Sequence, residues 1–209
     1  MKIEIRSSNE AIISGYVNVT ERYSRPLRYG GKRFIEKIKA GTFKKAIEDA
    51  ESENRAINML VDHNKNKVFA NTRDGTLYLK EDNVGLYARA AISDSEIIER
   101  ARKGGAKGWS FGFCNPKDEF ITEGDIEQRS IEKLTLGEVS LIFDKIPCYV
   151  GTSVEVRADG DVEYEERGYE DNVEIIELRA ENKDPEIDDK DFIDTYKKRV
   201  ELLKLRRDV

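Results

Sequence analysis

Alternating apolar and polar positions recur along the first three quarters of the chain and predict a series of short β-strands. The alternation is found in residues 11–19, 57–63, 75–82, 84–92, 131–143 and, more briefly, 152–157. Residues 107–113, with the sequence KGWSFGF, read as a further strand. Short strands at this close spacing favour a barrel or a sandwich over a parallel sheet with crossover helices.

Two segments have apolar positions three and four residues apart and predict helices. The first begins with Thr42 as its N-cap and continues through FKKAIEDAESE. The second, DSEIIERARKGG, is capped by Asp94 or Ser95 and ends at a pair of glycines. The predicted fold is therefore mainly β (α+β), with a few helices.

Charge divides the chain into two predicted parts. Residues 159–209 contain 18 acidic against 10 basic side chains, a balance of −8, whereas the whole chain carries −6, so residues 1–158 carry +2. We expect a folded domain over 1–158 and an acidic linker after it. Beyond Pro185, the spacing of Ile193, Tyr196, Val200 and Leu203 predicts an amphipathic helix in this tail.

Composition narrows the possible partners. The chain has no strongly basic face to predict nucleic-acid binding, no apolar run of about 18 residues to cross a membrane, and no secretory signal in MKIEIRSSNE. We therefore expect a cytoplasmic protein. One histidine and two cysteines, Cys114 and Cys148, are too few for a zinc site, so no metal and no cofactor are expected.

KGWSFGF contains a candidate nucleophile. In a strand Trp109, Phe111 and Phe113 share one face, and Ser110 shares the other with Gly108 and Gly112. The aromatic face is predicted to be core, and the glycines leave space for a substrate beside Ser110. The alternative is that the glycines mark a bulge or a bend and that Ser110 is merely a small packed residue.

A serine nucleophile needs a base, and His63 in VDHN is the only imidazole. Glu138 in LTLGEVSLIF lies within an apolar strand, where a carboxylate requires a partner. By accepting from one nitrogen of His63 it would leave the other to take the serine proton. Structural alternatives are His63 bonded to Asp62 or Asn64, and Glu138 paired with a base such as Arg89 or Arg129.

Two rival nucleophiles stay open. Ser140 lies on the same face as Glu138 but lacks flanking glycines. Cys114 or Cys148 with His63 would make a cysteine peptidase or a transferase, although free cysteines are more often inert packing residues.

The motifs VDHN, KGWSFGF and LGEVSLI followed by IPCYVGTSVEV, in this order, resemble the capsid maturation (prohead) serine proteases of tailed bacteriophages. GYVNVTERYSRPL and EKIKAGTF, at 15–27 and 36–43, resemble the N-terminal part of the same family. This resemblance, over about residues 10–157, implies a small closed β-barrel surrounded by helices, related to the herpesvirus assembly proteases. Those relatives use a second histidine, which this chain lacks, and Glu138 takes its place by position.

The resemblance implies a serine endopeptidase with Ser110, His63 and Glu138 as its triad. Its expected partners are the phage major capsid protein and scaffold, which it would cleave inside the assembling procapsid in the bacterial host. It would also cleave its own tail, and it could form a homo-oligomer. The oxyanion donors are expected in the loop around residues 145–151. A second hypothesis is a capsid scaffold or assembly protein that keeps the fold without the chemistry.

Overall fold

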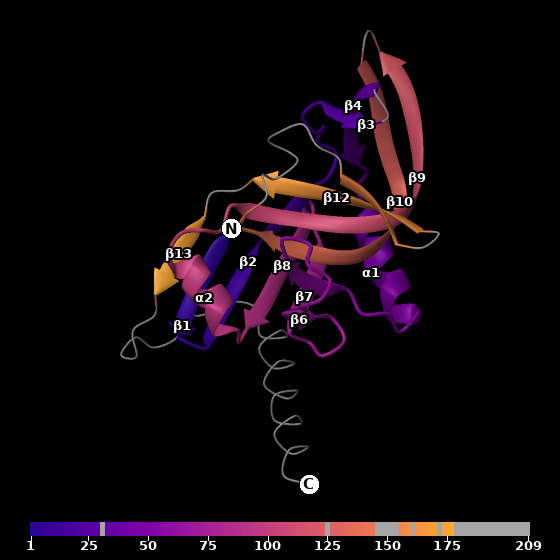
Figure 1. Ribbon diagram of the computed structural model, residues 1–209. Coiled ribbons are helices and arrows are strands. Elements are labelled where there is room, and N and C mark those ends of the chain that lie inside the picture. The colour runs from indigo at the N-terminus through magenta and orange to yellow at the C-terminus, as the bar shows by residue number, and fades with distance from the viewer. Residues whose placement is uncertain (30–31, 124–125, 145–154, 160–161, 171–172, 178–209) are drawn as a thin grey trace.

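The computed structural model describes residues 1–29, 32–123, 126–144, 155–159, 162–170 and 173–177 (Figure 1). In chain order its elements are β1 (Lys2–Ser7), β2 (Glu10–Val19), β3 (Leu27–Tyr29), β4 (Lys32–Ile38), α1 (Thr42–Ser52), β5 (Asn58–Val61), β6 (Ala70–Asn71), β7 (Leu77–Glu81), β8 (Gly85–Ile92), α2 (Ser95–Arg102), β9 (Gly108–Glu123), β10 (Ile126–Ile142), β11 (Glu155–Asp159), β12 (Val162–Glu170) and β13 (Glu174–Glu177). The expected mainly β class with two helices is confirmed. Within these residues, no helix is long and apolar enough to cross a membrane.

The described strands form two open sheets, not the closed barrel that the family resemblance implies. One sheet has the order β13-β1-β2-β8-β7, and the other has the order β11-β12-β9-β10-β4-β3, with β5 and β6 attached to its side. The second sheet branches at β10, because one edge of β10 pairs with β4 through residues 127–131 and then with β5 through residues 138–141. This branching replaces the continuous ladder that a closed barrel requires.

β9 and β10 form a long hairpin that runs from Ser110 and Glu138 to the far end of the second sheet. The two strands pair antiparallel from Gly108↔Ile142 to Glu123↔Ile126, with register shifts on either side of Lys133 and between Leu136 and Glu138. Figure 1 shows the far end of this hairpin extending beside β3 and β4, away from the first sheet.

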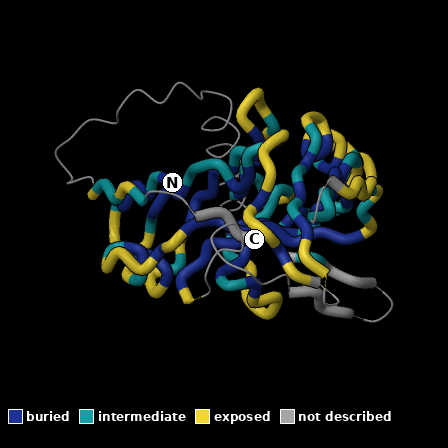
Figure 2. The backbone as a smooth tube through the Cα atoms, turned by 90° about the horizontal axis from the view of Figure 1, so that it is seen from above, coloured by how far each residue is buried: buried dark blue, intermediate teal, exposed yellow. Residues whose placement is uncertain are grey.

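The aromatic face of β9 lies in the core, as predicted. Trp109, Phe111 and Phe113 are fully buried, and the Phe111 ring stacks on Phe113 and meets the edge of Phe43 from α1. Figure 2 shows buried backbone through the middle of the molecule and exposed segments at its margins. The alternation of KGWSFGF therefore identifies the buried face correctly.

The helix ends follow the sequence signals only in part. Asp94 caps α2 by accepting a hydrogen bond from the backbone N–H of Ile97, as predicted. Thr42 is already the first residue of α1, and its hydroxyl donates to carbonyls of β10. The start of α1 is capped instead by Glu81 of β7, whose carboxylate accepts from the backbone N–H groups of Gly41 and Lys44. A cap supplied by a distant strand leaves no local sequence signal.

Paired strands occupy part of the segment after residue 158 that composition predicts to be a linker. β12 pairs antiparallel with β9, and β13 pairs parallel with β1. The charged composition of this segment does not predict a buried residue, yet the side chain of Arg167 is fully buried. The predicted helix at residues 193–203 lies outside the described residues.

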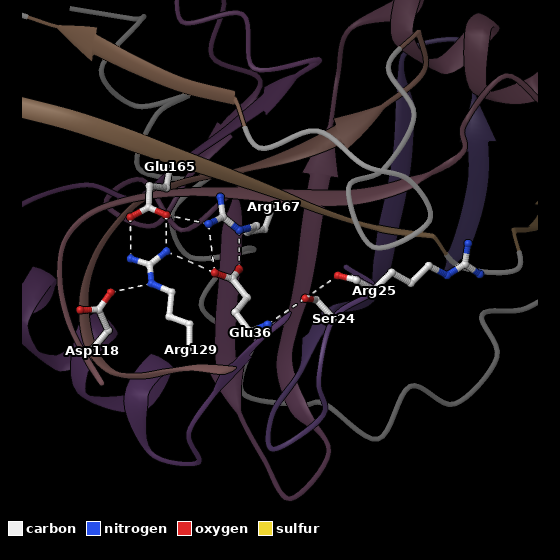
Figure 3. A network of polar contacts seen from close by, with 7 residues as sticks. All are labelled: Ser24, Arg25, Glu36, Asp118, Arg129, Glu165 and Arg167. Carbon is white, nitrogen blue, oxygen red and sulfur yellow. Dashed lines mark hydrogen bonds and ion pairs between the residues drawn. The ribbon is translucent and has the colours of Figure 1, made fainter. Parts of the chain in front are cut away.

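Arg167 belongs to a buried network of charges that joins four strands (Figure 3). Its guanidinium contacts the carboxylates of Glu36 on β4 and Glu165 on β12. Arg129 of β10 binds the same two carboxylates and Asp118 of β9. Each of the three carboxylates thus contacts at least one of the two guanidinium groups, which is the condition for burying charge.

The protonation of the network follows from these contacts. Burial lowers the pKa of the Arg129 guanidinium, but hydrogen bonds to Glu165 and the charge of Glu36 outweigh it and hold that pKa above its usual range. Burial raises the pKa of Glu165, but Arg129 and Arg167 outweigh it and bring the pKa below the ordinary 4.5. The hydrogen bonds and both pKa shifts therefore favour the ionised form of this pair.

Replacing Arg167 with methionine is expected to lower the free energy of unfolding by about 3–5 kcal/mol, because it leaves buried carboxylates short of a cation. Urea unfolding monitored by Trp109 fluorescence measures this loss. As a control, Lys32→Met removes an exposed ion pair with Glu127 and should cost less than about 1 kcal/mol. Equal, small effects of the two substitutions would contradict a stabilising role for the network.

The lowered pKa of Glu165 predicts an acid-sensitive stability. Its contribution is fully present above about pH 4.5 and is lost as the pH falls through the folded-state pKa. Glu165→Gln should therefore flatten the fall in urea midpoint between about pH 5 and pH 3. Glu99→Gln, at a surface ion pair with Arg102, is the matched control and should change that slope less.

Candidate active site

His63 lies in the turn that follows β5, at the end of the second sheet. Asp62 and His63 both have positive φ, 49° and 60°, which is uncommon for residues other than glycine. The backbone N–H of Asn64 closes this turn by donating to the carbonyl of Val61. Backbone conformations of this kind persist only where the surrounding structure holds them.

Asp62 holds the turn against the end of β10. Its Oδ1 accepts hydrogen bonds from the backbone N–H groups of Phe143, at 2.8 Å, and Asp144, at 3.0 Å, and its own N–H donates to the carbonyl of Leu141. Arg100 of α2 lies 3.7 Å from the Asp62 carboxylate and stacks over the Phe143 ring. These contacts fix where the imidazole of the next residue points.

The His63 side chain meets Glu138 directly. Nδ1 of His63 lies 2.6 Å from Oε1 of Glu138, and both side chains are buried. An ionised carboxylate only accepts hydrogen bonds, so Nδ1 carries the proton and Nε2 of a neutral imidazole is left as an acceptor. The contact with Glu138 thus favours the tautomer of His63 that carries its proton on Nδ1.

Ser140 completes the contacts of this carboxylate. Its Oγ donates to Oε2 of Glu138 at 2.6 Å and lies 3.4 Å from Nδ1 of His63. Ser140 is fully buried. It therefore approaches the imidazole on the nitrogen that Glu138 already occupies.

Ser110 is placed beside this cluster by strand register. It lies directly opposite Ser140 across the β9–β10 pair, and Gly112 lies directly opposite Glu138. Directly opposed residues share a face and have Cβ atoms about 4.5–5.5 Å apart. Ser110 is buried, at 2% exposure. The register therefore places a buried hydroxyl directly across from Ser140, whose own hydroxyl contacts Glu138 and lies near His63.

The two glycines beside Ser110 have different surroundings. A Cβ added to Gly112 would lie 2.4 Å from Oε1 of Glu138, so the missing side chain makes room for the carboxylate. Gly108 pairs with Ile142 of β10 and Glu170 of β12 at the start of β9. The space expected for a substrate at Gly112 is thus occupied by Glu138.

The residues named in the alternative hypotheses make different contacts. Arg129, one possible partner of Glu138, binds Glu36, Glu165 and Asp118 instead. Cys114 is buried with Sγ 3.9 Å from the carbonyl oxygen of Thr135, the position of a packed thiol. Cys148 and the loop expected to supply the oxyanion donors lie outside the described residues.

The sequence analysis names Asp62 and Ser140 but does not predict the contacts that they make at this site. It names Asp62 only as a possible hydrogen-bond partner of His63, whereas Asp62 binds the end of β10, about 80 positions away in the chain. Ser140 is expected as a rival nucleophile, and only its shared face with Glu138 signals its contact with the carboxylate.

A carboxylate and an imidazole held in one buried pair, with serine on the adjoining strand, are the components that serine hydrolases use for acyl transfer. A model of the caudovirus prohead serine protease family matches residues 1–166. The chain therefore belongs to this family, and is at that level a bacteriophage serine protease of capsid maturation. No curated protein and no solved structure matches the chain.

The fit of Gly112 to Glu138 can be tested by substitution. Gly112→Ala should cost about 1–3 kcal/mol of unfolding free energy, because its methyl group would overlap the hydrogen-bonded carboxylate. In a Glu138→Ala background the same change should cost much less, since the overlapping atoms are gone. Urea unfolding of the four proteins measures the coupling, and additive costs would contradict the contact.

Proposed function

We propose that this protein is the prohead maturation endopeptidase of a tailed phage, acting through Ser110, His63 and Glu138. The observation that carries the proposal is the buried 2.6 Å contact between His63 Nδ1 and Glu138 Oε1, formed one strand away from Ser110. Membership of the prohead serine protease family supports the reaction class.

In the proposed reaction, Ser110 Oγ attacks the carbonyl carbon of the scissile peptide while its proton passes to His63 Nε2. The imidazolium that forms is stabilised by the Glu138 carboxylate on Nδ1, and its Nε2 proton then goes to the leaving amine. Water repeats the sequence on the acyl-enzyme, which releases the acid and restores Ser110. Backbone N–H groups have to stabilise the oxyanion at each step.

The position of Ser110 restricts how a substrate reaches it. At Ser110 one edge of β9 pairs with Ser140 of β10 and the other with Gly168 of β12. A peptide cannot add to β9 as a further strand there, because both sets of backbone groups are already bonded. The substrate therefore has to reach Ser110 from the face of the sheet on which Ser140 and Glu138 also lie, and this face has to be uncovered first because all three side chains are buried.

The proposed substrates are segments of the phage scaffold and major capsid protein, cleaved within the procapsid, together with the chain's own acidic tail. A charged composition like that of the tail is typical of segments that a protease can cleave without unfolding a domain.

Co-expression with the cognate coat and scaffold proteins tests the proposal. Wild-type protein should shorten them, and Ser110→Ala should abolish the shortening, as seen by gel and intact mass. Glu138→Gln should slow it at least about 100-fold, because the amide no longer fixes the imidazole as an anion does. The mass of the purified chain, compared with that of Ser110→Ala, shows in addition whether the tail is removed.

Cys114→Ala is the matched control and should process normally, because its thiol is packed against the β10 backbone. Processing that survives Ser110→Ala but not Cys114→Ala would favour the thiol mechanism. Unprocessed substrates with every variant, wild type included, would favour a scaffold or assembly protein without catalytic activity.

A further inference from the structure

Ser140 is the one group of the cluster that the proposed reaction does not use. Its hydroxyl is fully buried and has two neighbours at hydrogen-bonding distances, Oε2 of Glu138 at 2.6 Å and Nδ1 of His63 at 3.4 Å. A buried hydroxyl beside an anion and an imidazole is either a nucleophile or a group that positions the other two.

The hydrogen-bond arrangement argues against the nucleophile. The carboxylate requires the proton of His63 on Nδ1, so that nitrogen has no lone pair to accept a proton from Ser140. The single proton of Ser140 is directed instead at Oε2 of Glu138. A serine that gives up its proton in catalysis has to face the other nitrogen, Nε2.

We infer that Ser140 is a positioning residue, which holds the Glu138 carboxylate in the orientation that binds Nδ1–H of His63. This inference rests on the proposed function for its catalytic meaning. A carboxylate has a broad torsional minimum about its last bond, and a single contact to His63 leaves that rotation open. The bond from Ser140 to the second oxygen closes it.

The strand supplies the rigidity that such a role requires. Glu138 and Ser140 are two residues apart on β10, and at this point β10 pairs with β9 on one edge and β5 on the other. The same β5 pairing leads directly into the turn that carries His63. The three side chains are therefore fixed by one set of backbone ladders.

The sole histidine makes the inference testable in the free protein. In full-length chain labelled with ¹⁵N-histidine, wild type should show His63 as the single Nδ1–H tautomer, with a proton protected from solvent exchange. Ser140→Ala should lose this protection and populate both tautomers. Ser140→Thr, which keeps the hydroxyl, should restore the wild-type pattern, and Ser130→Ala, a buried serine elsewhere on β10, should leave it unchanged.

Reactivity gives a second measurement. A fluorophosphonate probe should label wild type at Ser110, identified by peptide mass, and Ser140→Ala should be labelled at Ser110 about 10- to 100-fold more slowly. Urea unfolding confirms that each variant is folded. If Ser140→Ala does not fold, Ser140→Cys keeps the volume with a weaker donor and should show the same losses.

The two measurements separate the failure of this inference from that of the proposed function. An unchanged tautomer and an unchanged labelling rate in Ser140→Ala would overturn the positioning role and leave the triad intact. Wild type that resists the probe while showing the Ser140-dependent tautomer would count against the protease mechanism only. A label found on Ser140 would overturn both.

Discussion

The antiparallel ladder between β9 and β10 positions Ser110, Glu138 and Ser140 relative to one another. It puts Ser110 opposite Ser140 and Gly112 opposite Glu138, so that one face of two strands carries a hydroxyl pair and a carboxylate. A shift of this register by one residue would send Ser110 into the core and Trp109 to the other face. Such a shift would be costly because Trp109, Phe111 and Phe113 are fully buried. Burial of the aromatic face therefore also fixes the register of the polar face.

The parallel pairing of β5 with β10 brings the third component. β5 ends beside Leu141, the residue after Ser140, and Asp62 ties the turn that follows to the end of β10. A second network, formed by Glu36, Arg129 and Arg167, lies elsewhere on the second sheet and fixes β4 and β12 to the β9–β10 hairpin. The arginine network pairs opposite charges in the interior, whereas hydrogen bonds from His63 and Ser140 hold the Glu138 carboxylate.

The sequence predicted the mainly β class, both helices, the aromatic core face and the meeting of His63 with Glu138. The first three of these predictions rest on local patterns of residues. The fourth rests on the scarcity of histidine, because His63 is the only imidazole in the sequence that could pair with Glu138. Thr42 was expected to be the N-cap of the first helix, but Gly41 holds that position. Among the described residues no closed barrel is found, and strands occupy part of the segment expected to be a linker. Branching at β10, the Glu81 cap and the burial of Arg167 all arise from segments far apart in the chain, where periodicity carries no information.

By itself, then, the sequence determined which residues can do chemistry and which face of each strand is apolar, because side-chain type and a period of two are local properties. The tertiary structure decided which of those residues meet. In the folded protein Ser140 donates a hydrogen bond to Glu138, and the absence of a side chain at Gly112 leaves room for the Glu138 carboxylate. Asp62 binds the end of β10 and so holds the turn that contains His63. The reason is that strand register and parallel pairing are settled by packing across the whole sheet, and a distance of a few ångströms between residues 63 and 138 exists only after that packing is complete.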